Sequence, residues 1–205
     1  DGAVLSDRRF AGSDTLATSY ALSCAIKKIG DVKLVFCGRQ AIDGDTAQVG
    51  PQVAEKLEMQ QVTYAEKLVS VSEDKLQILR RLEHGVELVE APTPLLVTVG
   101  STAPECRFRV AERLLKYYKA QMPMEVPEEK KAEAEALWQE RPYLRLTEWN
   151  ADDVNPELDR LGLSGSATKV KQIENVVLLK KENVNVPVEP AAIESMWRDL
   201  QGVVF

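Results

Sequence analysis

One stretch in the first third of the chain combines a strand pattern, a polar loop and a helix pattern, and it constrains the fold more than any other. The apolar run Val32–Phe36, rich in β-branched residues, predicts a strand. The loop that follows, Cys37–Pro51, is rich in glycine and polar side chains. Val53, Ala54 and Leu57 then recur with helical spacing. A strand that reaches a helix through such a loop predicts an α/β sheet, in which ligands bind beyond the carboxyl ends of the strands.

Three glycines of this loop, Gly38, Gly44 and Gly50, predict close contact between a ligand and the backbone. Glycine permits positive φ angles and leaves room for a ligand. The first N–H groups of the following helix lack an intrahelical acceptor, so they can donate to a phosphate. An ordinary capped turn explains the same composition equally well, and the chain has neither a GxGxxG nor a GxxxxGK[ST] motif. Composition alone leaves both interpretations open.

The polar side chains of the loop fit the parts of a nucleotide. Thr46 and Gln48 are neutral donors for a phosphate, and Arg39 would balance its charge. Asp43 and Asp45 would repel a phosphate, so we expect them to accept from ribose hydroxyls or to cap the helix. The predicted cofactor site is formed by Cys37, Gly38, Arg39, Gln40, Ala41, Asp43, Gly44, Asp45, Thr46, Ala47, Gln48, Val49 and Gly50.

A second helix start precedes this loop in the chain. Ser13 is the predicted N-cap, Asp14 favours the positive end of the helix, and an apolar face continues until Gly30. The start of this helix is a candidate site for a second phosphate or a flavin edge, with Arg8 or Arg9 as counter-charge. From the residues alone, a helix cap beside solvated arginines is the simpler interpretation. The cofactor residues predicted here are Arg8, Ser13, Asp14 and Thr15.

The order of the remaining patterns predicts the fold class. Further strands are expected at residues 1–6, 61–68, 75–82, 86–90 and 95–99, the third and fourth as a hairpin and the last as a buried strand. We therefore expect an α/β fold with a doubly wound, mostly parallel sheet of adenine-nucleotide-binding type, an antiparallel hairpin and a C-terminal arm.

The chain divides by pattern into three parts. Residues 1–122 form the expected nucleotide-binding domain, residues 123–150 a charged helical connection between prolines, and residues 151–205 an arm with a last helix. In the first part, the stripe Val110, Leu114, Leu115 and Tyr118 is more typical of core than of an interface. Residues 161–177 have few large apolar side chains, as an arm lying on another chain would.

Composition excludes several classes of function. The net charge of −6 and the pI near 5.1 provide no basic surface for nucleic acid. Three cysteines, Cys24, Cys37 and Cys106, are too few and too far apart for a disulfide framework or a four-ligand zinc site, which favours the reduced cytoplasm. The sequence has no long apolar span, so no membrane partner is expected.

Three segments, in order along the chain, resemble the β subunits of electron transfer flavoproteins. Gly38–Pro51 (GRQAIDGDTAQVGP) is similar to that family's adenine-nucleotide loop. Ser6–Ser19 is similar to its preceding loop and helix start, and Leu163–Val170 to its C-terminal segment. The family begins with a βαβ portion that has no counterpart before Asp1, so we expect an N-terminal portion to be missing from this sequence.

The resemblance implies an electron carrier with two protein partners. The first is the α subunit of the electron transfer flavoprotein, which holds a mobile flavin. The second is an acyl-CoA dehydrogenase, for which the family's docking loop corresponds to Ala103–Arg109. The helix after this loop lacks the lysine-rich sequence of the better-known members, so the choice of dehydrogenase stays open.

The resemblance also implies the cofactor. The β site of this family holds either AMP, as a structural nucleotide, or a second FAD that accepts hydride from NADH in electron-bifurcating members. Asp45–Gly50 (DTAQVG) stands where the AMP-binding members have Asn-Gln-Thr-Gly, which favours FAD, with AMP as the alternative. Because the flavin performs the redox step, no catalytic side chain and no metal ligand are expected.

An unrelated adenine-nucleotide-binding α/β protein is the other class that stays open, for example a stress-type ATP binder or a nucleotidyl transferase. Such a protein would carry out metal-dependent phosphate chemistry. The sequence has no P-loop and no cluster of metal ligands. Its one histidine, His84, lies between two strand patterns and is expected in a turn.

Overall fold

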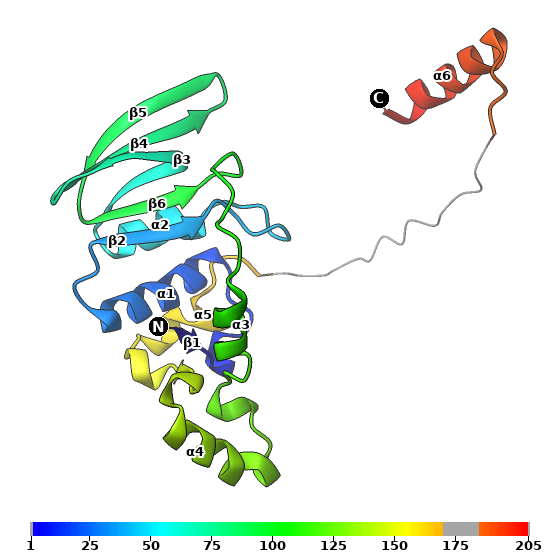
Figure 1. Cartoon of the computed structure of the whole chain (residues 1–205). Helices are drawn as coiled ribbons and strands as arrows, with labels where there is room; N and C mark the ends of the chain where they lie inside the picture. The colour runs from blue at the N-terminus through cyan, green and yellow to red at the C-terminus, as the bar shows by residue number, and fades with distance from the viewer. Residues whose placement is uncertain (1, 170–184, 205) are drawn as a thin grey trace. The chain divides into compact units, whose positions relative to one another are not determined.

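A computed structural model describes residues 2–169 and 185–204 of the chain. The chain divides into two compact units, Asp1–Lys169 and Val170–Phe205. In the first unit, a curved sheet lies on one side of a group of helices (Figure 1). The candidate site belongs to this unit.

The first unit contains a five-stranded mixed sheet with the strand order β2-β6-β3-β4-β5. The strands are β2 (Leu34–Gly38), β3 (Gln60–Val71), β4 (Lys75–Leu82), β5 (Gly85–Pro92) and β6 (Leu95–Val99). β6 is parallel to β2 and β3, whereas β4 is antiparallel to β3 and β5. The predicted α/β class and the hairpin with His84 in its turn are confirmed.

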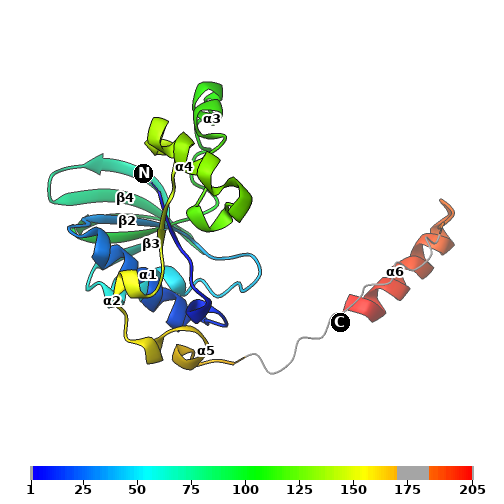
Figure 2. The same ribbon diagram turned by 90° about the horizontal axis from the view of Figure 1, so that it is seen from below.

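Two helices, α1 (Thr15–Ile29) and α2 (Val49–Lys56), lie on the same side of this sheet (Figure 2). Val53 and Ala54 of α2 pack on Leu96 of β6, and Ile26 of α1 joins this cluster. On the opposite face, Leu95 and Val97 pack with residues of β3, β4 and β5. α1 and α2 therefore cover the same face of the five-stranded sheet (Figure 2).

The strand before α1, β1 (Ala3–Leu5), pairs in parallel with β7 (Thr147–Trp149) in a separate two-stranded sheet. The strand expected within residues 1–6 is present, but it lies outside the five-stranded sheet. Arg9 stabilises the pairing region, since its guanidinium bridges Asp7 at 2.6 Å and Asp152 at 2.8 Å. These hydrogen bonds hold the pKa of Asp7 well below its usual range.

Short helices connect the remaining residues of the first unit. The α-helices are α3 (Ala111–Tyr117), α4 (Lys131–Glu140) and α5 (Gly162–Gly165), and the 3₁₀ turns are η1 (Arg8–Phe10), η2 (Pro123–Glu125), η3 (Glu128–Lys130), η4 (Pro142–Leu144), η5 (Asp152–Val154) and η6 (Leu158–Arg160). Ala134 and Trp138 of α4 are buried in a small second core. The charged connection is therefore partly packed.

Two burial predictions are corrected. Val110, Leu114, Leu115 and Tyr118 are between 52% and 83% exposed, so this stripe is surface and not core. Leu161 is 2% exposed and packs beside α1, so the first part of the expected arm lies on its own unit. The rest of that segment, 170–177, lies outside the described residues.

The second unit contains the predicted last helix, α6 (Pro190–Val204). Its partly exposed apolar side chains are Ile193, Met196, Trp197 and Leu200. Across the ranges that the structure describes, none of the helices has the length and apolar character needed to cross a membrane.

Candidate nucleotide site

The structure brings the two predicted cofactor segments together. The Thr15 hydroxyl at the start of α1 donates to Oε1 of Gln48 at the start of α2 (2.8 Å). One turn further along both helices, Ser19 Oγ donates to Gln52 Oε1 (3.0 Å). Lys56 Nζ also donates to Ser19 Oγ, at 2.8 Å. This ladder of polar contacts, with i, i+4 spacing on each helix, keeps the two helix starts side by side.

The N-terminus of α2 has unsatisfied donors. No side chain caps it, and its first internal bond runs from the Gln52 N–H to the Gln48 carbonyl (3.0 Å). Within residues 2–169 and 185–204, no protein acceptor takes the backbone N–H groups of residues 46–50. A consecutive set of free N–H groups at the positive end of a helix is a site for an anion such as phosphate. This end of α2 therefore meets the main requirement of the predicted nucleotide loop.

The N-terminus of α1 differs, because Asp14 already occupies it. Its Oδ1 accepts from the N–H groups of Leu16 (2.9 Å) and Ala17 (3.0 Å). Asp14 is thus the N-cap, and the prediction that Ser13 caps this helix was wrong. Ser13 turns back instead, and its hydroxyl donates to the Phe10 carbonyl (2.6 Å).

The C-terminal segment of the first unit fixes Asp14 in place. Asp14 Oδ2 accepts from Thr168 N (2.9 Å) and Thr168 Oγ1 (3.0 Å), and the Asp14 N–H donates to Ser166 Oγ (2.8 Å). Burial works to raise the pKa of Asp14, but the hydrogen bonds from Ala17, Thr168 and Leu16 outweigh it and lower the pKa to about 2. Asp14 is therefore an ionised group engaged on both oxygens.

The glycines of the loop act differently from the prediction. Gly38, Gly44 and Gly50 all lie outside the positive-φ region, and Asp45 (φ 49°) and Ala47 (φ 54°) adopt it instead. At Gly50, an added Cβ would lie 2.7 Å from Thr98 Cγ2 of β6. Gly50 thus permits close helix–sheet packing, while Gly44 has open space around it.

The other predicted residues occupy different surroundings. Arg39 lies over the ring of Tyr64, 5.6 Å from its centroid, and Gln40 Nε2 donates to Asp45. Burial raises the pKa of the Cys37 thiol. Ala41, Asp43 and Thr46 are exposed, as is Arg8, whereas Ala47 and Val49 are half-buried.

Arg9, which the sequence suggested as an alternative counter-charge, forms salt bridges with Asp7 and Asp152. Sequence reasoning also missed two residues of the site, Thr98 and Ser166. Thr98 contacts the start of α2 from β6, and the sequence pattern of β6 indicates only a buried strand. Ser166 reaches Asp14 across more than 150 residues of sequence, and only the resemblance of Leu163–Val170 to a known family signalled its segment.

Comparison with known proteins supports the same family assignment. Residues 1–137 match the electron transfer flavoprotein domain. The chain is 39% identical over 193 residues to an electron transfer flavoprotein subunit beta of Clostridium acetobutylicum, which covers 94% of the chain and 64% of that protein. It is 51% identical over 113 residues to Protein FixA of Azotobacter vinelandii, which covers 53% of the chain and 40% of that protein.

A third relative is the acryloyl-CoA reductase electron transfer subunit gamma of Anaerotignum propionicum. It is 40% identical over 174 residues, which cover 83% of the chain and 57% of that protein. The chain spans less than two thirds of the length of each of these three relatives. The domain match and the shared motifs show that the chain belongs to the electron transfer flavoprotein family, among relatives of the β-subunit and FixA type.

Proposed function

We propose that this chain binds an adenine nucleotide at the start of α2 and serves as the β subunit of an electron transfer flavoprotein. The free N–H groups of residues 46–50 carry the proposal, because they offer a phosphate several donors in one turn. The neighbouring helix α1 has its own carboxylate cap, so it orients α2 without competing for the phosphate.

We further propose FAD as the nucleotide, with AMP as the alternative. The sequence Asp45–Gly50, which stands in place of Asn-Gln-Thr-Gly, favours FAD. When bound, FAD would supply the hydride and single-electron chemistry. The chain would hold the phosphate through backbone donors and the ribose through the exposed carboxylate of Asp43. NADH is the expected donor if this FAD supports electron bifurcation.

The proposed protein partners are an electron transfer flavoprotein α subunit and an acyl-CoA dehydrogenase. The name of the Anaerotignum propionicum relative links that protein to an acyl-CoA reductase. In this chain, the end of the predicted docking loop and the helix after it line an open groove of about 1050 Å³, and the lining includes Phe108, Arg109 and Tyr118. Phe108 is 98% exposed, and Leu114 and Tyr118 in the same groove are exposed as well, so an apolar surface is open to a protein partner.

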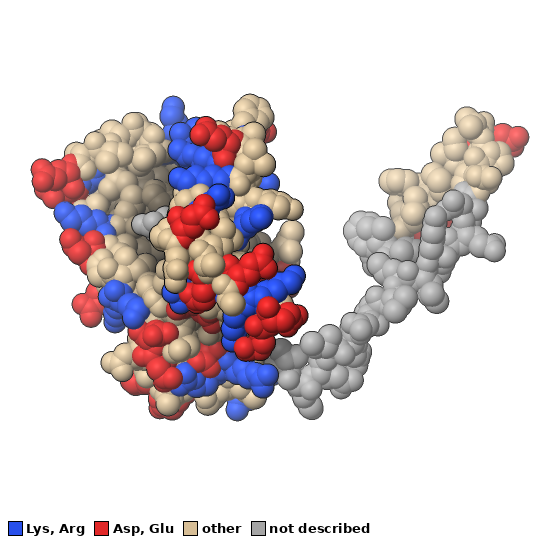
Figure 3. All heavy atoms as spheres, turned by 60° about the horizontal axis from the view of Figure 1, so that its bottom comes forward, with Lys and Arg blue, Asp and Glu red and all other residues tan. Residues whose placement is uncertain are grey.

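Charge over the rest of the surface does not point to nucleic acid. Acidic and basic side chains alternate on the face shown in Figure 3, without a continuous basic stripe. A protein partner recognised through the apolar groove fits this surface better than a polyanion does. The three cysteines are free thiols, which fits a reducing compartment such as the cytoplasm.

Ligand release tests this proposal. The chain is co-purified with an electron transfer flavoprotein α subunit, and the bound ligands are released by heat and identified by chromatography and absorbance. Two FAD per heterodimer would support the proposal. One FAD with one AMP would support a nucleotide site in this chain but identify its ligand as AMP. A single FAD with no AMP would contradict a nucleotide site in this chain.

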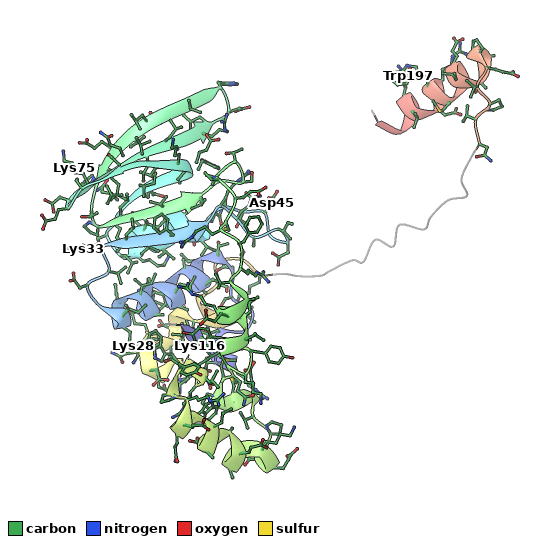
Figure 4. All side chains as sticks on the ribbon, viewed as in Figure 1. Lys28, Lys33, Asp45, Lys75, Lys116 and Trp197 are labelled. Carbon is green, nitrogen blue, oxygen red and sulfur yellow. The ribbon has the colours of Figure 1, made fainter. Side chains whose placement is uncertain are left out.

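Matched variants locate the ligand within the chain. Gly44→Val adds a branched side chain in the open space of the loop, so we expect loss of one nucleotide per heterodimer with the fold retained. Lys33→Met is the control, because Lys33 is exposed and lies at the opposite end of β2 from Asp45 (Figure 4). Equal nucleotide content in both variants would show that the loop does not bind the nucleotide.

A further inference from the structure

The helix that lines the groove at Phe108, α3, is attached to the first unit mainly at one end. None of its residues is buried. In the ranges that the structure describes, residues 104–109, which precede it, form no backbone hydrogen bond. After the helix, the Gln121 N–H donates to the Leu144 carbonyl (3.0 Å), and the Leu146 N–H donates to the Gln121 carbonyl (3.1 Å). The orientation of α3 therefore depends on the contacts at its C-terminal end.

A cluster of three side chains, the aromatic clamp of Lys116, Tyr117 and Tyr143, lies at that end of α3. Lys116 Nζ is 5.4 Å from the ring centroid of Tyr117 and 4.8 Å from that of Tyr143 (Figure 4). The two rings meet edge to face, with centroids 5.7 Å apart and an interplanar angle of 85°. Both arrangements are attractive. The clamp thus joins α3 to η4, a segment that follows it by more than 20 residues.

The segment that carries Tyr143 is well packed. The next residue of η4, Leu144, is 2% exposed and clusters with Val126, Ala134 and Trp138 in the second core. This core includes α4, and α3 and α4 lie near each other in both ribbon views (Figures 1 and 2). Tyr143 is therefore attached to a buried core, whereas the helix that it contacts is exposed.

Tyr143 influences the groove only indirectly. Tyr117 lines the groove at Phe108, but Tyr143 does not. Phe108 and Tyr118 of the groove are 98% and 83% exposed, so they have few neighbours that fix their positions. A binding surface that must be ordered when a partner docks has a lower apparent affinity than one that is oriented beforehand. A contact that orients α3 in the free protein therefore favours docking.

We propose that Tyr143 is a positioning residue for partner docking, because through Lys116 and Tyr117 it fixes the direction in which α3 presents the groove at Phe108. This inference rests on the proposed docking role of the groove. It gives the charged connection of residues 123–150 a function, which is to support the docking helix. Since Tyr143 acts through α3, it affects the affinity for the partner and neither the nucleotide content nor the transfer step in the docked complex.

Hydrogen exchange measures the effect of the clamp on α3. The chain is prepared with its α subunit as Tyr143→Leu, which removes the ring, and as Tyr143→Phe, which keeps it. We expect the amides of α3 to exchange about three- to tenfold faster in Tyr143→Leu and at the wild-type rate in Tyr143→Phe. Lys28→Met is the matched control, because Lys28 lies 5.3 Å from the ring centroid of Trp149, outside the clamp, and it should leave exchange in α3 unchanged.

Electron transfer measures the consequence for docking. Each heterodimer accepts electrons from an acyl-CoA dehydrogenase that its acyl-CoA substrate has reduced, and KM for the heterodimer is determined separately from kcat. Tyr143→Leu should raise KM about three- to tenfold and leave kcat within about twofold, with unchanged nucleotide content. Tyr143→Phe and Lys28→Met should match the wild type. If urea unfolding shows that Tyr143→Leu does not fold, Lys116→Met removes the cation from the clamp and should produce the same changes.

The outcomes separate this inference from the proposed function. Unchanged exchange in α3 would overturn it, and a raised KM with unchanged exchange would make Tyr143 a direct contact of the partner. An unchanged KM for Tyr143→Leu, with a raised KM for Phe108→Ala, would overturn the inference and keep the proposed docking groove. A wild-type heterodimer that accepts no electrons from the dehydrogenase would overturn both.

Discussion

Replacing Asp14 tests the inference that this carboxylate holds the protein together and is not a ligand contact. Asp14 accepts two hydrogen bonds from the first turn of α1 and two from Thr168. Asp14→Ala removes all four acceptors. Asp14→Asn keeps an oxygen for the helix cap, because asparagine caps helices well, but cannot accept from Thr168 through its NH₂ group. The two variants therefore separate the cap from the long-range contact.

The expected cost follows from these contacts. Loss of an N-cap costs about 0.5–2 kcal/mol. The two bonds from Thr168 are exposed to solvent, so together they contribute about 1 kcal/mol. We expect Asp14→Ala to lower the free energy of unfolding by about 1.5–3 kcal/mol and Asp14→Asn by about 1 kcal/mol. In a double-mutant cycle, Asp14→Asn and Thr168→Val should couple by about 0.5–1 kcal/mol.

Urea unfolding at several pH values measures these effects. The pKa of folded Asp14 is about 2, below the usual aspartate value of 3.8. A lowered pKa means that the stabilisation is complete above about pH 4 and is lost as the pH falls towards the folded pKa. The stability difference between wild type and Asp14→Asn should therefore be constant near neutral pH and narrow below about pH 4.

Two results would refute this account of Asp14. One is a loss below about 0.5 kcal/mol for Asp14→Ala, which would mean that the hydrogen bonds contribute little to folding. The other is an Asp14→Asn variant with unchanged stability and an AMP or FAD affinity reduced tenfold or more. That outcome would restore Asp14 as a cofactor-binding residue.

Three further predictions concern other parts of the first unit. Gly50→Ala should lower the free energy of unfolding by about 1–3 kcal/mol, because the added Cβ would overlap Thr98. Gly44→Ala, at an open position, should change it by less than about 0.5 kcal/mol. Equal effects of the two variants in urea unfolding would contradict the packing argument. Burial and the nearby charge of Arg160 lower the pKa of Lys56, so Lys56→Met should lower the free energy of unfolding by less than about 0.5 kcal/mol near neutral pH. As the pH rises into the range where Lys56 loses its proton, the free energy of unfolding of the wild type should increase relative to that of the variant. A loss above about 2 kcal/mol near neutral pH would show that the charge of Lys56 is stabilising. Phe108→Ala should slow electron transfer to an acyl-CoA dehydrogenase without changing nucleotide content, and an unchanged rate in stopped-flow absorbance would place docking elsewhere.

Local patterns predicted the elements that surround the site. The apolar run before the loop, the helix after it and the hairpin around His84 all formed near their expected positions. In these segments, periodicity, turn residues and burial lead to the same structure. The predicted loop also meets the start of α1, as the contact between Thr15 and Gln48 shows.

Long-range contacts could not be predicted in the same way. β7 is three residues long and includes Glu148, so its pairing with β1 has no local signal. The choice of Asp14 over Ser13 as N-cap depends on Ser166 and Thr168, which arrive from the far end of the first unit. Positive φ values fell on Asp45 and Ala47 and not on the glycines, and of the three loop glycines only Gly50 packs closely against the sheet.

The most direct test of the central claim is an amide NMR titration of the chain with AMP. The account predicts that the largest shifts of backbone N–H signals occur at residues 46–50, where the free donors of α2 would meet the phosphate. The N–H signals of Leu16 and Ala17 should change less, because Asp14 already accepts from them. Largest shifts at the start of α1 or around the groove at Phe108, or no saturable shifts at all, would contradict a nucleotide site at the start of α2.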